Sequence, residues 1–270
     1  MLDIKGKELF EFNSKKLWLF DMDGTIYLGN NIFEGVLELL DKIEKSGGKY
    51  VFITNNSSKS VTDYISKVQK MGIKADESNF FTSSNATVLL LKEKYSDTLI
   101  YAQGTNSFIT ELKKSGLNIT TKYDKNAKCV VVGFDSELTG EKMIETCKTL
   151  TLNEVDYYAT NPDWVCPMEF GYMPDCGSMC QSYERATGKK PIFIGKPEPT
   201  MIYEVMKKFG YVKQETVVIG DRIYTDIASG VNAGVDTILV LSGEATMETY
   251  NSSEIKPKYL INHVKELNSL

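Results

Sequence analysis

Short apolar segments alternate with amphipathic ones along the N-terminal part of the chain. Residues 16–21 (KLWLFD) and 49–56 (KYVFITNN) are apolar runs that end in polar residues, as buried strands do. Residues 33–48 and 58–72 repeat apolar positions at helical spacing, and the first of these two segments ends in a Gly-Gly pair that stops a helix. The order strand, helix, strand, helix predicts a parallel sheet covered by helices.

The same alternation returns in the last third of the chain and also occurs in its middle. The expected elements of the last third alternate strand and helix in the order 191–195, 199–210, 216–221, 226–234 and 237–243. Residues 83–183 contain strands and helices of their own, so they predict a smaller α/β domain inserted into the first. We therefore expect an α/β fold with one domain formed by residues 1–82 and 184–270 and another formed by residues 83–183.

Composition narrows the classes of function. The chain has 270 residues and a formal net charge of −5, which gives no electrostatic reason to expect nucleic acid or an acidic membrane surface as a partner. No stretch approaches the roughly eighteen uninterrupted apolar residues of a membrane span, and the N-terminus lacks the apolar core of a signal peptide. We therefore expect a cytoplasmic protein, and we expect its five cysteines to be reduced.

The scarcity of histidine limits the chemistry further. His263 is the only histidine, which argues against a Ser-His or Cys-His nucleophile. Cys176 and Cys180 are spaced to share one side of a helix, but zinc prefers three or four protein ligands and the chain offers no histidine near them. Carboxylates, lysine and an oxygen-bound metal remain as the groups that could carry a reaction.

Two acidic segments directly follow expected strands. Asp21 and Asp23 lie two residues apart beside Gly24-Thr25, and Asp221 and Asp226 follow a later strand. In open α/β sheets the ligand crevice lies at the carboxyl ends of the strands, and paired carboxylates there suit a hard cation with oxygen ligands. Either segment alone also fits an ordinary turn, in which aspartate and glycine are common.

Two other segments offer groups that bind anions. Thr54, Asn55, Asn56 and Ser57 follow a strand and precede an expected helix, where hydroxyl, amide and backbone N–H groups can bind a phosphate. The same residue types also serve as simple helix caps. Lys196 follows an apolar strand, and its ammonium group could neutralise a phosphoryl oxygen, although most lysines are merely solvated.

The order of the four segments along the chain supports a functional interpretation more strongly than any single segment does. DMDGT at 21–25, TNNS at 54–57, GKP at 195–197 and GDRIYTD at 220–226 supply an acid pair, a hydroxyl, a lysine and a second acid pair. This order resembles the haloacid dehalogenase superfamily, and within it the class IIA branch of NagD-like and p-nitrophenyl phosphatase-like enzymes. The resemblance spans nearly the whole chain. It implies a Rossmann-like parallel-sheet core with an inserted cap domain.

The resemblance also implies an activity and a cofactor. The expected enzyme is a Mg²⁺-dependent phosphatase that hydrolyses small-molecule phosphate monoesters, such as sugar or polyol phosphates, through an aspartyl-phosphate. Asp21 would be the nucleophile and Asp23 the general acid and base. Mg²⁺ would bind one Asp21 oxygen, the Asp23 backbone carbonyl and the Asp221 carboxylate, while Asp226 would orient these groups. The phosphoryl oxygens would be bound by Thr54, Asn55, Asn56 and Lys196.

Alternative functions remain open at this point. A phosphotransferase or phosphomutase on the same scaffold shares the first half-reaction, and the four segments do not separate it from a phosphatase. A non-catalytic, receiver-like signalling module also places Asp, Thr and Lys at a sheet edge, but it lacks a large inserted domain. Asp23 favours phosphoryl transfer over dehalogenation, because a halide leaving group needs no proton.

The inserted domain carries the features expected to set specificity. Residues 159–163 (ATNPD) resemble the NPD segment of class IIA caps. Where relatives have a PGxGS-like turn, this chain has PDCGS at 174–178, which places Asp175 and Cys176 near the expected entrance. Relatives form dimers through caps and core edges, so a homodimer is among the expected assemblies. Residues expected either to line an apolar lid or to form cap core are Trp164, Phe170, Tyr172 and Met173.

Overall fold

The computed structural model describes residues 1–168 and 170–270. Contacts divide the chain into two compact units. The first unit consists of Met1–Thr54, Val61–Phe81 and Lys196–Leu270, and the second consists of Asn55–Ser60 and Thr82–Gly195. The chain therefore passes from one unit to the other after residues 54, 60, 81 and 195.

The contact-defined units differ from the expected domains at two places, since residues 55–60 also belong to the second unit. The division after residue 81 lies one position from the expected end of the first segment at residue 82. The expected return at residue 184 falls inside helix α6 (Cys176–Thr187), and the contacts place the return at Lys196 instead. Helix α6 packs in the core of the second unit, and the next strand, β12 (Ile192–Phe193), pairs with a strand of the same unit, which accounts for the later position.

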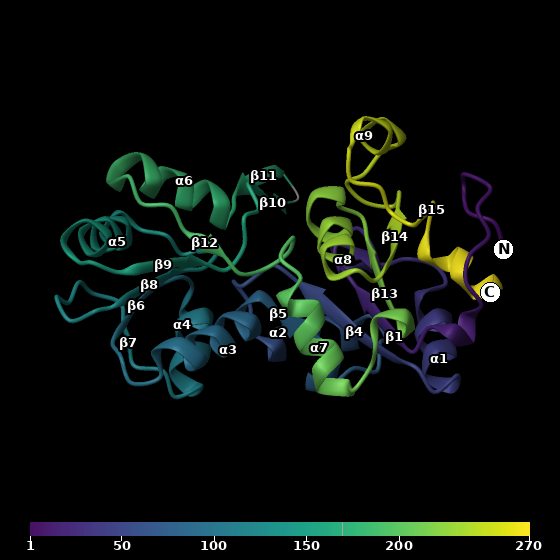
Figure 1. Ribbon diagram of the computed structural model, residues 1–270, viewed down its shortest axis with the longest axis horizontal. Coiled ribbons are helices and arrows are strands. Elements are labelled where there is room, and N and C mark those ends of the chain that lie inside the picture. The colour runs from purple at the N-terminus through teal and green to yellow at the C-terminus, as the bar shows by residue number, and fades with distance from the viewer. Residues whose placement is uncertain (169) are drawn as a thin grey trace. The chain divides into compact units, whose positions relative to one another are not determined.

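A six-stranded sheet forms the centre of the first unit. Its strands follow the order β15-β14-β13-β1-β4-β5, and the pairs from β4 to β15 are parallel. In Figure 1 the purple N-terminal strand β1 and the green strand β13 run side by side, so the two ends of the chain build one sheet. The strands are β1 (Leu17–Phe20), β4 (Lys49–Thr54), β5 (Phe80–Thr82), β13 (Thr216–Gly220), β14 (Asp236–Val240) and β15 (Tyr259–Ile261).

Helices cover both faces of this sheet, as the predicted α/β fold requires. Trp18 and Phe20 of β1 belong to the same buried cluster as apolar residues of α1 (Val36–Lys45) and α2 (Val61–Lys70). On the opposite face, α8 (Ala228–Ala233) packs against β14 and against α7 (Thr200–Phe209). Both faces of each central strand are therefore buried, which explains why these strands are continuous apolar runs.

The second unit contains a five-stranded parallel sheet of order β12-β9-β8-β6-β7. The expected strand at 191–195 is β12 (Ile192–Phe193), and it joins this sheet rather than the six-stranded one. The sequence of a short apolar strand does not indicate which of two parallel sheets the strand will join. The other strands are β6 (Ile100–Gln103), β7 (Ile119–Thr120), β8 (Cys129–Val132) and β9 (Asp156–Ala159), and the helices are α3 (Ser83–Tyr95), α4 (Asn106–Lys114), α5 (Gly140–Leu152) and α6.

Two hairpins complete the described structure. The expected loop at residues 24–31 contains the hairpin of β2 (Tyr27–Leu28) and β3 (Asn31–Ile32). In the second unit, β10 (Val165–Met168) pairs with β11 (Gly171–Pro174). A last short helix, α9 (Met247–Ser252), precedes β15. Among the residues described, no helix combines the length and the apolar character that crossing a membrane needs.

Candidate active site

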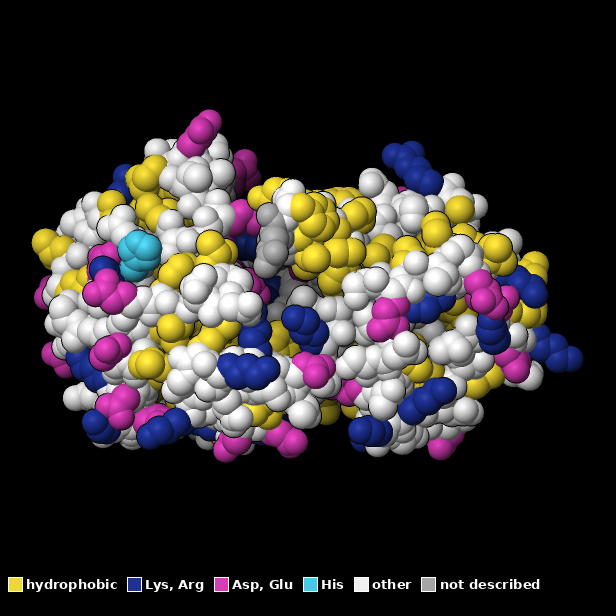
Figure 2. Space-filling view, turned by 180° about the vertical axis from the view of Figure 1, so that it is seen from behind, with side chains coloured by type: hydrophobic (Ala, Val, Ile, Leu, Met, Phe, Trp, Pro, Cys, Tyr) yellow, Lys and Arg dark blue, Asp and Glu magenta, His cyan; other side chains and the backbone are white. Residues whose placement is uncertain are grey.

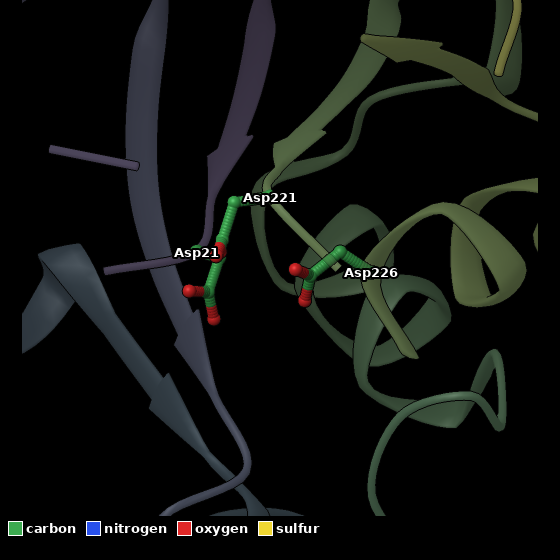
Figure 3. A group of neighbouring side chains, drawn as sticks. All are labelled: Asp21, Asp221 and Asp226. Atoms are coloured by element: carbon green, nitrogen blue, oxygen red, sulfur yellow. The ribbon is translucent and has the colours of Figure 1, made fainter. Parts of the chain in front are cut away.

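The parallel register of β1 and β13 brings two acidic segments together. Phe20, the last residue of β1, pairs with Ile219 of β13, so Asp21 and Asp221 follow neighbouring strand ends. Asp226 lies one turn further on, in the helical turn Ile223–Ile227. Oxygen atoms of Asp21, Asp221 and Asp226 all lie within 4.8 Å of one another, and Figure 3 shows the carboxylate of Asp226 turned toward Asp21 and Asp221. The expected acid cluster is therefore present in the first unit.

A buried lysine neutralises part of this charge. Lys196 is 2% exposed, and its Nζ lies 2.6 Å from Asp21 Oδ1 and 2.6 Å from Asp226 Oδ1. The same Nζ donates a hydrogen bond of 3.0 Å to the backbone oxygen of Ile53, at the end of β4. Burial acts to lower the pKa of Lys196, but the carboxylates of Asp21 and Asp226 outweigh it and raise this pKa above its ordinary value. Lys196 is therefore a fixed positive charge in contact with Asp21.

The crowded carboxylates resist ionisation. Burial, and then the neighbouring charge of Asp226, raise the pKa of Asp21 well above its usual range, although Lys196 opposes the effect. Burial and Asp226 also raise the pKa of Asp221 to about 6. A carboxyl group must be ionised to act as a nucleophile or a metal ligand, so more positive charge than Lys196 provides is needed near neutral pH.

The donor set fits a divalent cation of the hard, oxygen-preferring kind. Asp21 and Asp221 offer carboxylate oxygens, whereas Asp226 is already bonded to Lys196 and to the backbone N–H of Arg222 at 3.0 Å. Mg²⁺ typically uses one or two protein carboxylates and fills its remaining positions with water and phosphate oxygens. Asp21 and Asp221 are therefore the carboxylates that could hold the ion.

Glycines make room for the Asp221 side chain. Its Oδ2 accepts a hydrogen bond of 2.7 Å from the Glu244 N–H, and its Oδ1 lies 3.4 Å from the Thr25 hydroxyl. A Cβ atom added at Gly24 would lie 2.5 Å from Asp221 Oδ2, and one added at Gly243 would lie 2.5 Å from the carboxyl carbon. Any larger residue at either glycine would displace the carboxylate.

Asp23 is not part of the Asp21–Asp221–Asp226 cluster and has neighbours that the sequence did not reveal. Its side chain is 55% exposed and lies 3.7 Å from Lys67 Nζ of α2. The Tyr27 hydroxyl donates a hydrogen bond of 3.3 Å to Asp23 Oδ2. Burial, with the charge of Asp23 next, raises the pKa of Tyr27 above its ordinary value, so this hydroxyl stays protonated. Tyr27 lies in the segment 24–31 that was expected to be a loop, and Lys67 lies in the expected helix at 58–72.

The segment after β4 is divided between the two units. Thr54 is the last residue of β4 and is buried in the first unit, whereas Asn55 and Asn56 belong to the second. Asn56 Oδ1 accepts a hydrogen bond of 2.9 Å from the Ser58 N–H. Helix α2 begins only at Val61, so the expected helix N-terminus does not directly follow these residues.

A buried polar network in the second unit includes the NPD segment. Asn55 Nδ2 donates to Asp163 Oδ2 at 2.9 Å. Asn161 Nδ2 donates to the same oxygen at 2.8 Å and to Asp175 Oδ1 at 3.0 Å. Asp175 is 5% exposed and caps α6, and Cys176 is fully buried, so neither side chain is exposed in the described structure. Their position near an entrance stays a prediction. An aspartate that precedes a helix is used as its cap, because it satisfies a backbone N–H that has no partner in the helix.

The β10–β11 hairpin carries an exposed apolar surface. The side chains of Trp164, Phe170 and Tyr172 are 54%, 77% and 64% exposed. Hydrophobic side chains gather over this hairpin in Figure 2. Met173 instead packs against the buried cluster of the second unit. Of the four residues expected in a lid or in cap core, three are therefore exposed in the described structure and one is partly buried.

Known proteins are similar to this chain in both sequence and fold. Models described as haloacid dehalogenase-like hydrolase and HAD-hydrolase-like match residues 18–118 and 193–267. An acid sugar phosphatase from Staphylococcus epidermidis is 35% identical over 243 residues, which are 90% of this chain and 92% of the relative. This chain belongs to the haloacid dehalogenase superfamily.

Solved structures specify the branch of the superfamily. A 4-nitrophenylphosphatase from Thermotoga maritima is 35% identical to this chain and superposes on it with a TM-score of 0.90. The match covers 96% of this chain and 98% of the phosphatase chain. A protein described as a putative nagD protein is 33% identical with a TM-score of 0.87, covering 95% of this chain and 98% of that one. The class IIA branch predicted from the four segments is confirmed, and so is the α/β fold.

Proposed function

We propose that this protein is a Mg²⁺-dependent phosphatase that hydrolyses small-molecule phosphate monoesters through an aspartyl-phosphate. The observation that carries the proposal is the contact of Asp21 with the buried Lys196, next to Asp221 and Asp226 at the carboxyl edge of the sheet. A carboxylate and a fixed cation at one sheet edge suit attack on a phosphoryl group. The names of the similar phosphatases support the same reaction class.

Each residue of the site has a proposed role. The Asp21 carboxylate attacks phosphorus, and Asp23 gives a proton to the leaving oxygen and later takes one from water. Lys196 and Thr54 bind phosphoryl oxygens, and Asp226 holds Lys196 in place. Further proposed phosphate ligands are Asn55 and Asn56.

Asp21, Asp221 and the Asp23 backbone carbonyl are the proposed ligands of Mg²⁺. When bound, the ion offsets the negative charge of the carboxylates and of the transferring phosphoryl group. The raised pKa values of Asp21 and Asp221 support this assignment, because both groups need positive charge to be ionised at neutral pH. The second unit is the proposed cap, and a sugar phosphate is the proposed substrate class.

Phosphate release from p-nitrophenyl phosphate and from a panel of sugar phosphates tests the proposal. Release should require Mg²⁺ and should be lost in Asp21→Asn, whereas the exposed Asp41→Asn should behave like the wild type. Turnover by Asp21→Asn, or turnover in the presence of excess chelator, would contradict the mechanism. Transfer of the phosphate to added alcohols in place of its release would favour a phosphotransferase.

A further inference from the structure

Two side chains from separate elements contact the exposed carboxylate of Asp23. Tyr27 of β2 donates a hydrogen bond of 3.3 Å to Oδ2, and Lys67 of α2 lies 3.7 Å from Oδ1. Each carboxylate oxygen of Asp23 therefore has its own partner. An aspartate that is 55% exposed on a turn would otherwise be free to change rotamer.

Tyr27 and Lys67 also contact each other. Lys67 Nζ lies 3.7 Å from the centre of the Tyr27 ring, within the range of a cation–π interaction. Tyr27 is fully buried, and its backbone oxygen accepts a hydrogen bond of 2.8 Å from the N–H of Gly24, the residue after Asp23. The Tyr27 ring therefore restricts the position of the Lys67 ammonium group. The backbone hydrogen bond to Gly24 holds Tyr27 close to Asp23.

We propose that Tyr27 and Lys67 are positioning residues that hold the Asp23 carboxyl group in the orientation from which it protonates the leaving oxygen. The inference rests on the proposed function, since it assigns Asp23 as the proton donor. Neither residue needs to contact the substrate. Their effect is to keep one rotamer of an exposed side chain populated, so that less order has to be gained in the transition state.

The assisted step is the first half-reaction. An Asp21 oxygen forms a bond to phosphorus while the bond between phosphorus and the ester oxygen breaks. The electron pair of the broken bond goes to that oxygen, which takes the proton of the Asp23 carboxyl group, and Asp23 is left as a carboxylate. A leaving group that forms a stable anion departs without this proton, whereas a poorer one depends on it.

Two aryl phosphates of similar size separate protonation from other effects. The p-nitrophenolate anion is stabilised by its nitro group and needs little proton donation, whereas phenolate needs more. The value of kcat/KM covers the steps up to departure of the leaving group, so the ratio of kcat/KM for phenyl phosphate to that for p-nitrophenyl phosphate reports proton transfer. A purely structural defect lowers both values together and leaves the ratio unchanged.

The variants are Asp23→Asn, Tyr27→Phe and Lys67→Met, with Lys70→Met as the matched control. Lys70 lies on the same helix and lines the same hollow of about 570 Å³ as Lys67, but within the described structure it has no ion pair with Asp23. Lys67→Gln replaces Lys67→Met if the latter does not fold. Thermal unfolding confirms that each variant is folded before the kinetics are measured.

Asp23→Asn is expected to lower the ratio by about 100-fold or more, in line with the usual contribution of a general acid. Tyr27→Phe and Lys67→Met should each lower the ratio about 10-fold, which is the size of effect expected when one contact to Asp23 is lost. The value of kcat/KM for p-nitrophenyl phosphate should change less than about 3-fold. Lys70→Met should leave the ratio unchanged. In the Asp23→Asn background, the other two substitutions should have no further effect on the ratio.

Different outcomes refute the positioning role of Tyr27 and Lys67 and the proposed function. If Asp23→Asn lowers the ratio but Tyr27→Phe and Lys67→Met do not, the positioning role is refuted and the phosphatase mechanism stands. The positioning role is also refuted if these two variants still lower the ratio in the Asp23→Asn background. If Asp23→Asn leaves the ratio unchanged, or the wild type releases phosphate from neither ester, the proposed function is refuted and the inference with it.

Discussion

Asp221 is a buried carboxylate whose ionisation the folded chain disfavours, and its replacement by asparagine has a counterintuitive expected result. Burial and the charge of Asp226 raise its pKa from 3.8 to about 6. Asp221→Asn removes the charge but keeps the shape. We expect this variant to be more stable than the wild type without metal near neutral pH, and to lose the stabilisation that Mg²⁺ provides.

The magnitude follows from the pKa difference. Asp221 is 2% exposed, so solvent screening is small. A shift of about two pKa units corresponds to about 3 kcal/mol of folding free energy at ~1.4 kcal/mol per unit. For a protein of this size that is an increase of roughly 5 to 10 °C in the midpoint of thermal unfolding, as an upper value.

The sign depends on pH. A carboxyl group with a raised folded-state pKa binds its proton more tightly in the folded than in the unfolded chain, so its protonated form stabilises the fold at low pH. This contribution is complete below pH 3.8 and is lost as the pH rises to about 6. The advantage of Asp221→Asn should therefore be absent near pH 4 and complete by pH 7.

The asparagine side chain can retain the existing contacts. Its carbonyl oxygen can accept the Glu244 N–H that now bonds Asp221 Oδ2 at 2.7 Å. Its amide group can donate to the Thr25 hydroxyl, which lies 3.4 Å from Oδ1. Little stability should therefore be lost through unsatisfied hydrogen bonds.

Thermal unfolding in chelator and in excess Mg²⁺, between pH 4 and pH 7.5, measures the effect. Asp236→Asn is the matched control of opposite sign, because Lys258 and Lys15 lower the pKa of Asp236 against the effect of burial. That control should lose stability at pH 7 and keep its response to Mg²⁺. If Asp221→Asn is less stable than the wild type in chelator at pH 7, or still gains stability from Mg²⁺, the reasoning is refuted.

Three further substitutions test the surroundings of the site and the polar network of the second unit. Gly243→Ala should displace Asp221 and lower turnover at least about ten-fold. Gly140→Ala is the control, because a Cβ atom there meets nothing within 4 Å, and it should leave turnover unchanged. Equal activity of the two variants would contradict the steric argument. Lys196→Met should lower the free energy of unfolding at pH 7 by about 3 to 5 kcal/mol, measured with denaturant, because it leaves buried carboxylates without their cation. Asn161→Ala should cost about 2 to 4 kcal/mol by the same assay, since two buried carboxylates lose their shared donor, and a cost below about 0.5 kcal/mol would count against the network.

Several features of the site could be predicted because they are local or follow from strand direction. Asp21 and Asp221 each come directly after an apolar run, and the carboxyl ends of parallel strands meet at one edge. The proximity of Asp21 and Asp221 follows from this rule. That of Lys196 does not, because the strand before it, β12, belongs to the five-stranded sheet. Their roles in the reaction stay predictions.

Other features depend on packing that no pattern encodes. β12 joins the five-stranded sheet although its sequence suits either sheet. Lys67 reaches Asp23 because of how α2 packs beside the β2–β3 hairpin, and nothing in its helical spacing sets it apart from Lys70. Asp175 is buried as the cap of α6, a role that only the position of the helix start reveals.

The sequence by itself determined the fold class and the chemical groups available, because the alternation of apolar runs and the residues at their ends are properties of neighbouring positions. The tertiary structure decided which of those groups meet and how each is charged. Lys196 and Asp21 are 175 positions apart in the chain and yet in contact. The pKa of Asp21 is raised because folding buries it and brings the charges of Asp226 and Asp221 close to it. Burial and distance are properties of the folded chain, and they turn ordinary acids and a lysine into a candidate active site.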